Sequence, residues 1–127
     1  AMRAGTALLV GEQDFSAFRA AECQAKSPVK LLHRADVLRH GDCIVFDFRA
    51  SAFLHHMVRN IVGLLLEVGR GDAPPWRARE QLDSRTRSTG AATAPAHGLY
   101  LWQVSYAPGF GLPADSAIIA PPGLPWI

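Results

Sequence analysis

The chain has 127 residues, of which 49% are hydrophobic and 19% charged. A chain of this length forms one ordinary domain with a single core, and this balance is not that of disordered or collagen-like sequences. The longest nearly apolar stretch, residues 61–68, is far shorter than the roughly 20 residues that a membrane-spanning helix needs. The first ten residues lack the long apolar region of a secretory signal. We therefore expect a soluble, cytoplasmic protein that binds no membrane.

Cysteine and charge patterns narrow the chemistry further. Cys23 and Cys43 lie 20 positions apart, without a CxxC pair or a histidine at zinc-finger spacing. We therefore expect two reduced thiols and no metal site. The net charge of +2 comes with eleven arginines and only two lysines. A planar guanidinium suits phosphate and base contacts, so this excess gives weak support for an RNA partner.

The first quarter of the chain predicts two short helical segments. Residues 2–10 are expected to form a helix that ends at Gly11. In the next segment, Asp14 is a suitable N-cap for a short turn. Phe15 and Phe18 are three positions apart, so such a turn places both rings on one face.

A hairpin and a long helix follow. Residues 29–39 and 43–50 have the alternating pattern of strands, with a tight connection between them. Residues 53–69 are apolar around most of a helical circumference, which predicts a helix buried on most sides. The polar residues share one narrow face, which must look into a cleft, a partner or solvent: His55, His56, Arg59, Asn60, Gly63 and Glu67.

The remaining chain predicts a second helix, a loop and a strand. Residues 76–85 regain helical periodicity, residues 84–97 have loop composition, and residues 97–106 have strand character. Residues 108–127 are rich in proline and glycine, which predicts a tail with little regular structure. The order of elements predicts an α+β domain over residues 1–107, with helices packed on one face of a mostly antiparallel sheet.

Arg59 is the strongest candidate for chemistry because it lies on the polar face of a mostly buried helix. A buried guanidinium needs an anion, since an unpaired buried charge is costly. That anion is an internal carboxylate, a phosphate, or a carboxylate delivered by another segment. The structural alternative is a salt bridge to Glu67 or Asp47 that ties the helix to the hairpin.

Two neighbouring groups are weaker candidates. His55 and His56 point about 100° apart on a helix and cannot chelate one metal as an i, i+4 pair does, so we expect them to line a core or cleft. Phe18 and Arg19 could stack on and hold a base, as aromatic rings and guanidinium planes do in RNA recognition. Phenylalanines three positions apart are more often simply core residues.

Three stretches together resemble the C-terminal half of the bacterial tRNA pseudouridine synthase A family. They are GEQDFSAFRA at 11–20, AFLHHMVRNIVGLLLEVGRG at 52–71 and TAPAHGLYLWQVSY at 93–106. The resemblance implies the corresponding half of the pseudouridine synthase fold over residues 1–107. It also implies an isomerase that converts uridine to pseudouridine in the anticodon arm of tRNA, acts as a homodimer and uses no metal or organic cofactor.

The same resemblance implies that Arg59 matches the family's arginine that pairs with the catalytic aspartate. That aspartate lies in an Arg-Thr-Asp-x-Gly context in the N-terminal half of the family. None of the aspartates here has this context: Asp14, Asp36, Asp42, Asp47, Asp72, Asp83 and Asp115. We therefore expect a piece of a longer enzyme that is inactive alone.

Two other classes of function compete with this interpretation. A free-standing RNA-binding module would hold tRNA with a steep dependence on salt. A dimerisation domain would self-associate and ignore RNA.

Overall fold

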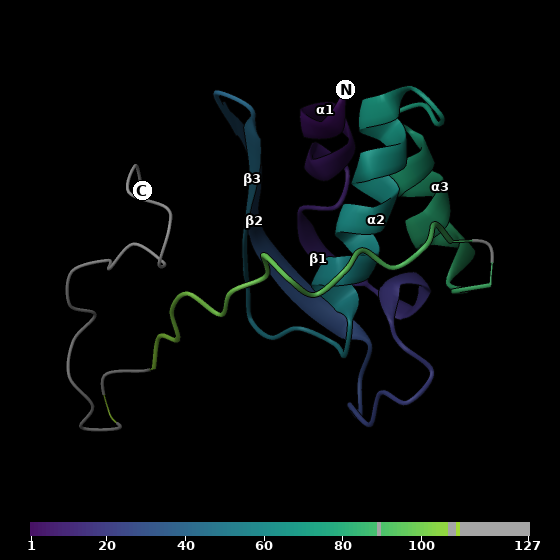
Figure 1. Ribbon diagram of the computed structural model, residues 1–127. Helices are drawn as coiled ribbons and strands as arrows, with labels where there is room; N and C mark the ends of the chain where they lie inside the picture. The colour runs from purple at the N-terminus through teal and green to yellow at the C-terminus, as the bar shows by residue number, and fades with distance from the viewer. Residues whose placement is uncertain (89, 107–108, 110–127) are drawn as a thin grey trace. The chain divides into compact units, whose positions relative to one another are not determined.

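The computed structural model describes residues 1–88, 90–106 and 109 (Figure 1). The chain divides into two units, Ala1–Pro95 and Ala96–Ile127, and the helices and strands found among the described residues belong to the first. The tail expected over residues 108–127 lies outside the described residues, apart from Gly109. None of the helices in the described part of the chain is long and apolar enough to cross a membrane.

A three-stranded antiparallel sheet forms one layer of the first unit, in the order β1-β2-β3. The strands are β1 (Gly11–Asp14), β2 (Val29–His40) and β3 (Cys43–Ala50). The predicted hairpin is confirmed, with Val37 opposite Phe46 and His40 opposite Cys43. Gly41 allows the tight turn because its φ of +60° lies in the left-handed region that glycine enters without penalty.

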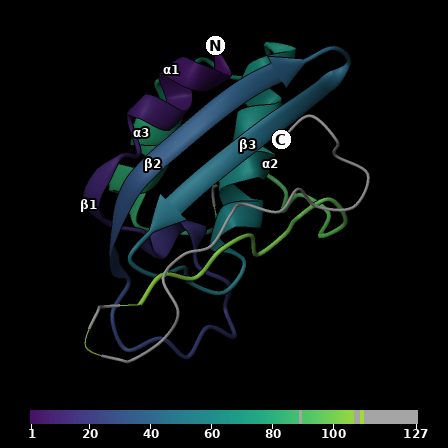
Figure 2. The ribbon, with the colours of Figure 1, turned by 90° about the vertical axis from the view of Figure 1, so that its left-hand side faces the viewer.

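The helices lie on one face of this sheet (Figure 2). They are α1 (Met2–Ala7), a short 3-10 helix η1 (Ser16–Phe18), α2 (Met57–Arg70) and α3 (Arg77–Ser84). This arrangement confirms the α+β class and the helices at both predicted positions after residue 50. Residues 85–88 and 90–95 carry no helix or strand, as the sequence predicts for this loop.

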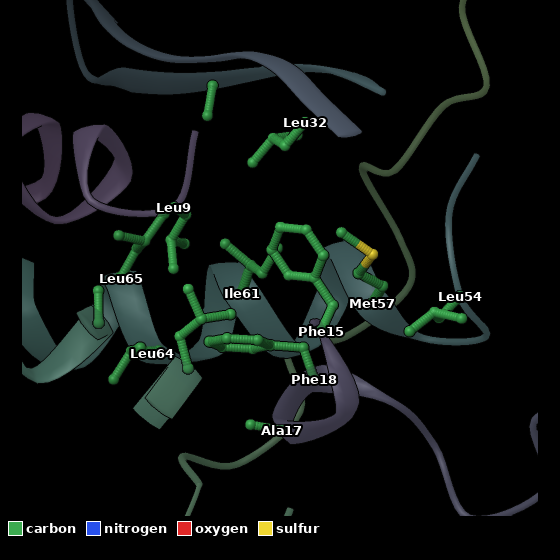
Figure 3. Close-up of a cluster of buried hydrophobic side chains, with 13 residues drawn as sticks. Leu9, Phe15, Ala17, Phe18, Leu32, Leu54, Met57, Ile61, Leu64 and Leu65 are labelled. Carbon is green, nitrogen blue, oxygen red and sulfur yellow. The ribbon is translucent and has the colours of Figure 1, made fainter. Parts of the chain in front are cut away.

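The core lies between sheet and helices and is built from aromatic and aliphatic side chains (Figure 3). Phe15 and Phe18 are 0% and 1% exposed, with ring centroids 6.4 Å apart. Ile61, Leu64 and Leu65 of α2 are no more than 1% exposed and belong to the same cluster. Burial of each such side chain contributes about 1.5–3 kcal/mol, which fixes η1 against α2.

Some of the predicted elements differ from the structure. Helix α1 ends at Ala7, three residues early, because the N–H groups of Leu8 and Leu9 bond back three residues and close the last turn. Residues 11–14 form a strand before the expected turn, because β2 offers pairing partners for them. Residues 97–106 form no strand in the structure, contrary to the prediction, because strand propensity alone does not make a strand.

The loop before Pro95 packs closely on α2. A Cβ atom at Gly63 would overlap the carbonyl oxygen of Ala92 and approach the backbone N of Ala94 to 3.3 Å. For Gly69, on the same helix, the nearest atoms to such a Cβ belong to the flexible side chain of Met2. Gly63 therefore lets the loop backbone lie directly on the helix.

We predict opposite effects of alanine at these two glycines. Gly63→Ala should lower the free energy of unfolding by about 1–3 kcal/mol, because the new methyl group meets a fixed backbone. Gly69→Ala should leave it unchanged or raise it by up to about 1 kcal/mol, because alanine favours a helix and the end of Met2 can move. Urea unfolding of both variants measures this difference, and equal midpoints would contradict the packing described here.

Candidate functional site

The segment before α2 makes a sharp turn at two histidines. His56 has a φ of +60°, which is uncommon for a residue with a side chain, and this conformation starts the helix at Met57 instead of residue 53. The rings of His55 and His56 lie 4.0 Å apart between centroids. The carbonyl of His55 accepts a hydrogen bond from the backbone N of Ala20 at 3.0 Å, which ties the turn to the segment after η1.

Arg59 lies in the first turn of α2 and is half-buried. Its Nε donates to the carbonyl oxygen of Ala94 at 2.8 Å, and its Nη1 lies 3.1 Å from Nε2 of His56. The backbone N of Ala94 in turn donates to the carbonyl of Arg59 at 3.1 Å. The Arg59 guanidinium is thus fixed by neutral acceptors of its own chain.

No carboxylate pairs with Arg59 in residues 1–88, 90–106 and 109. The predicted structural alternative, an ion pair with Glu67 or Asp47, does not form there, and Asp47 instead lies 3.5 Å from Arg34. Hydrogen bonds to a carbonyl and an imidazole leave the positive charge of Arg59 uncompensated. This cation is therefore suited to a carboxylate or phosphate from outside the described residues.

His56 is shifted toward its neutral form. Burial lowers the pKa of the imidazole below its usual 6.5, and the positive charges of His55 and Arg59 lower it further, against an opposing effect of Glu22. A neutral ring can accept at Nε2, which is the role that a donating Arg59 Nη1 requires. The lowered pKa of His56 thus favours the neutral ring that accepts the hydrogen bond from Arg59.

Asn60 lies on the buried side of α2 and is only 3% exposed. Its Nδ2 donates to the carbonyl of Phe18 at 2.8 Å. Its Oδ1 accepts from Oγ1 of Thr93 at 2.7 Å and from Nη2 of Arg87 at 3.2 Å. The sequence pattern placed Asn60 on the polar face but carried no signal for Arg87 and Thr93, because these partners come from a distant loop.

The remaining candidates have different surroundings. Arg19 donates through Nη2 to the carbonyls of Cys23 at 3.0 Å and Ala25 at 2.6 Å, and so folds the segment after η1 on itself. Backbone N–H groups of Ala25 and His55 lower the pKa of the Cys23 thiol in this segment. Phe18 is 1% exposed within the core, so contact between its ring and a nucleotide would require the core to open. The described residues contain no cluster of three metal-ligating side chains.

Most of this chain matches the model of a known protein family. A model described as tRNA pseudouridine synthase matches residues 6–107. This chain belongs to the tRNA pseudouridine synthase family. The match includes α2, the Arg59 contacts and the loop that packs on Gly63, so the described site lies within the family's own domain.

Individual relatives agree with the family assignment. A tRNA pseudouridine synthase A of Aromatoleum aromaticum is 55% identical over 128 residues, with 100% of this chain and 48% of the relative covered. One of Albidiferax ferrireducens is 54% identical over 89% of this chain and 44% of the relative. One of Legionella pneumophila strain Corby is 50% identical over 87% and 42%. The chain thus spans about half the length of the curated synthases it matches.

We predict that His56 makes the folded synthase chain sensitive to mild acid. Because its pKa is lowered on folding, the stability that the neutral ring provides is complete above about pH 6.5 and is lost as the pH falls through the lower pKa. Protonation also removes the acceptor for Arg59. The urea midpoint should therefore fall between about pH 7.5 and about pH 5.5.

The control is His56→Asn, since asparagine tolerates a positive φ and does not titrate. Its urea midpoint should depend less on pH over the same range. Equal slopes for the two proteins would show that His56 remains solvated, and an NMR titration of its ring would then give a midpoint at or above 6.5.

Proposed function

We propose that this chain is part of a tRNA pseudouridine synthase that isomerises uridine to pseudouridine in the anticodon arm of tRNA. The surroundings of Arg59 support this most directly. Its guanidinium is bonded to neutral groups, so it can still pair with an anion. We further propose that the anion is the catalytic aspartate, which belongs to the part of the enzyme that this chain does not span. The chain alone should then be inactive.

The chemistry needs a well-placed carboxylate and no redox partner. The N1–C1′ bond breaks, a C5–C1′ bond forms, C5 loses its proton and N1 gains one, so no electrons enter or leave. An aspartate must be ionised to assist this exchange, and a guanidinium beside it lowers its pKa and aims it. The target nucleotide must first leave its stack, at a cost of a few kcal/mol. The reaction requires no metal or organic cofactor.

The RNA surface proposed here surrounds the start of α2. His55 is exposed beside the half-buried His56, and Arg19 lies on the segment that is hydrogen-bonded to His55. These three side chains are suited to phosphate or base contacts. We propose that Phe18 supports this surface from the core, where its carbonyl holds Asn60.

The proposal also covers the oligomeric state, the cellular location and the extent of the synthase domain. The resemblance supports a cytoplasmic homodimer, with residues 1–107 as the synthase domain and residues 108–127 as an appended tail. An RNA-binding module without activity is the second candidate, and it is separated from the first by the assay below.

The assay is tritium release from C5-labelled uridine in tRNA. It compares this chain alone with a joined enzyme, in which the chain replaces the matched 48% of the Aromatoleum aromaticum relative. Release from the joined enzyme but not from the chain alone supports the proposal. Activity from neither, with tRNA retained in a salt-dependent manner, would support the RNA-binding module instead.

We predict that Arg59→Ala in the joined enzyme lowers the rate of tritium release by at least about 100-fold, because the aspartate loses its charged partner. Binding of tRNA, measured by gel shift, should change by less than about threefold, since many other contacts hold the RNA. The matched control is Arg70→Ala, which removes an exposed arginine paired with Asp72 from the other end of α2. Near-normal turnover of Arg59→Ala would remove Arg59 from the active site.

A further inference from the structure

The position of the Arg59 guanidinium depends on a segment that has no regular structure. Its Nε bonds to the carbonyl of Ala94 at 2.8 Å, and residues 91–95 belong to no helix or strand. The backbone bond from Ala94 N to Arg59 O, 3.1 Å long, ties the same two residues together. Something besides a ladder of backbone bonds must therefore hold Ala94 in place.

A second pair of residues lies directly beside this one. Thr93 precedes Ala94, Asn60 follows Arg59, and Oγ1 of Thr93 donates to Oδ1 of Asn60 at 2.7 Å. The loop and helix α2 are thus joined at two consecutive residues on each side. Neighbouring residues on a helix point about 100° apart, so Asn60 holds the loop from the core side while Arg59 reaches along it.

Asn60 is itself fixed from both ends. Its Nδ2 donates to the carbonyl of Phe18 at 2.8 Å, and the side chain is 3% exposed. Arg87 reinforces the opposite end, since its Nη2 donates to Asn60 Oδ1 at 3.2 Å, to Thr93 Oγ1 at 3.1 Å and to the carbonyl of Ala91 at 2.7 Å. These bonds leave the loop little freedom to move along the helix.

From this geometry we propose that Thr93 and Asn60 are positioning residues for Arg59. They hold the Ala94 carbonyl where it orients the guanidinium, and they touch neither the substrate nor the reacting atoms. The inference rests on the proposed role of Arg59 in turnover. It extends that role to two residues that act on Arg59 through the Ala94 carbonyl.

The decisive variant is Thr93→Val, which keeps the shape of the side chain and removes its hydroxyl. Thr93 is exposed, so this change leaves the core intact. In the joined enzyme, Thr93→Val should lower kcat by about 10-fold or more, because misplacement of a catalytic constellation by about 1 Å costs up to 100-fold. Both KM and tRNA affinity should stay within about threefold. Thr93→Ser, which retains the hydroxyl, should keep kcat within the same limit.

A double-mutant cycle separates positioning from a general loss of structure. Lysine has no Nε–H group to donate to Ala94, so Thr93→Val should have almost no further effect on kcat in an Arg59→Lys background. If the two substitutions acted independently, their fold-losses in kcat would multiply instead. Val68→Ala, at the other end of α2, serves as the stability control because Val68 is 2% exposed and outside this network.

Three outcomes would overturn the proposal. The first is equal kcat values for Thr93→Val and Thr93→Ser, and the second is a loss of kcat on Thr93→Val in the Arg59→Lys background as large as in the unmodified protein. The third is a loss of kcat that follows thermal unfolding as it does in Val68→Ala. The proposed function has its own test in the same set of proteins. If Arg59→Lys and Arg59→Ala both turn over normally, the role of Arg59 fails. If they are impaired while Thr93→Val behaves as Thr93→Ser, only the positioning inference fails.

Discussion

The hydrogen bond between Arg59 and the Ala94 carbonyl joins helix α2 to a loop without regular structure, and the geometry of the site depends on it. An arginine side chain has about 2 kcal/mol of rotamer entropy, which a flexible cation would lose at the moment of binding an anion. Here the loop and His56 already hold the guanidinium. A charge that is oriented in advance needs no reorganisation when its partner arrives, and such preorganisation is a major source of electrostatic catalysis.

The arginines of this chain fall into two chemical groups. Several on the surface pair with carboxylates, such as Arg70 with Asp72 at 3.0 Å and Arg79 with Asp83 at 2.7 Å. Exposed pairs of this kind contribute about 0–1 kcal/mol each. Arg19, Arg59 and Arg87 instead donate to backbone carbonyls and other neutral groups, so no carboxylate within the described residues cancels their charge. This contrast supports the proposal that an anionic partner binds near the start of α2.

The hydrophobic core and the polar network meet at η1. The rings of Phe15 and Phe18 pack in the same cluster as Ile61, which brings the backbone of η1 against α2. The carbonyl of Phe18 is thereby presented to the Nδ2 of Asn60. Apolar burial sets the distance between the two elements, and the buried amide sets their register, since a displaced Asn60 would leave polar groups unsatisfied inside the protein.

The sequence by itself determined the α+β class, the hairpin and helix α2, because hydrophobic periodicity is a local signal. It also marked Arg59 as the candidate site residue, because a single cation on an apolar helix is a local signal too. It did not determine that residues 11–14 pair as a strand, or that residues 97–106 do not, since pairing depends on a partner strand elsewhere in the chain. The two groups that donate to Oδ1 of Asn60 are 27 and 33 residues away, at Arg87 and Thr93, and no local pattern encodes such contacts. Only the tertiary structure decided which groups hold Arg59, because close packing at Gly63 brings the loop onto the helix.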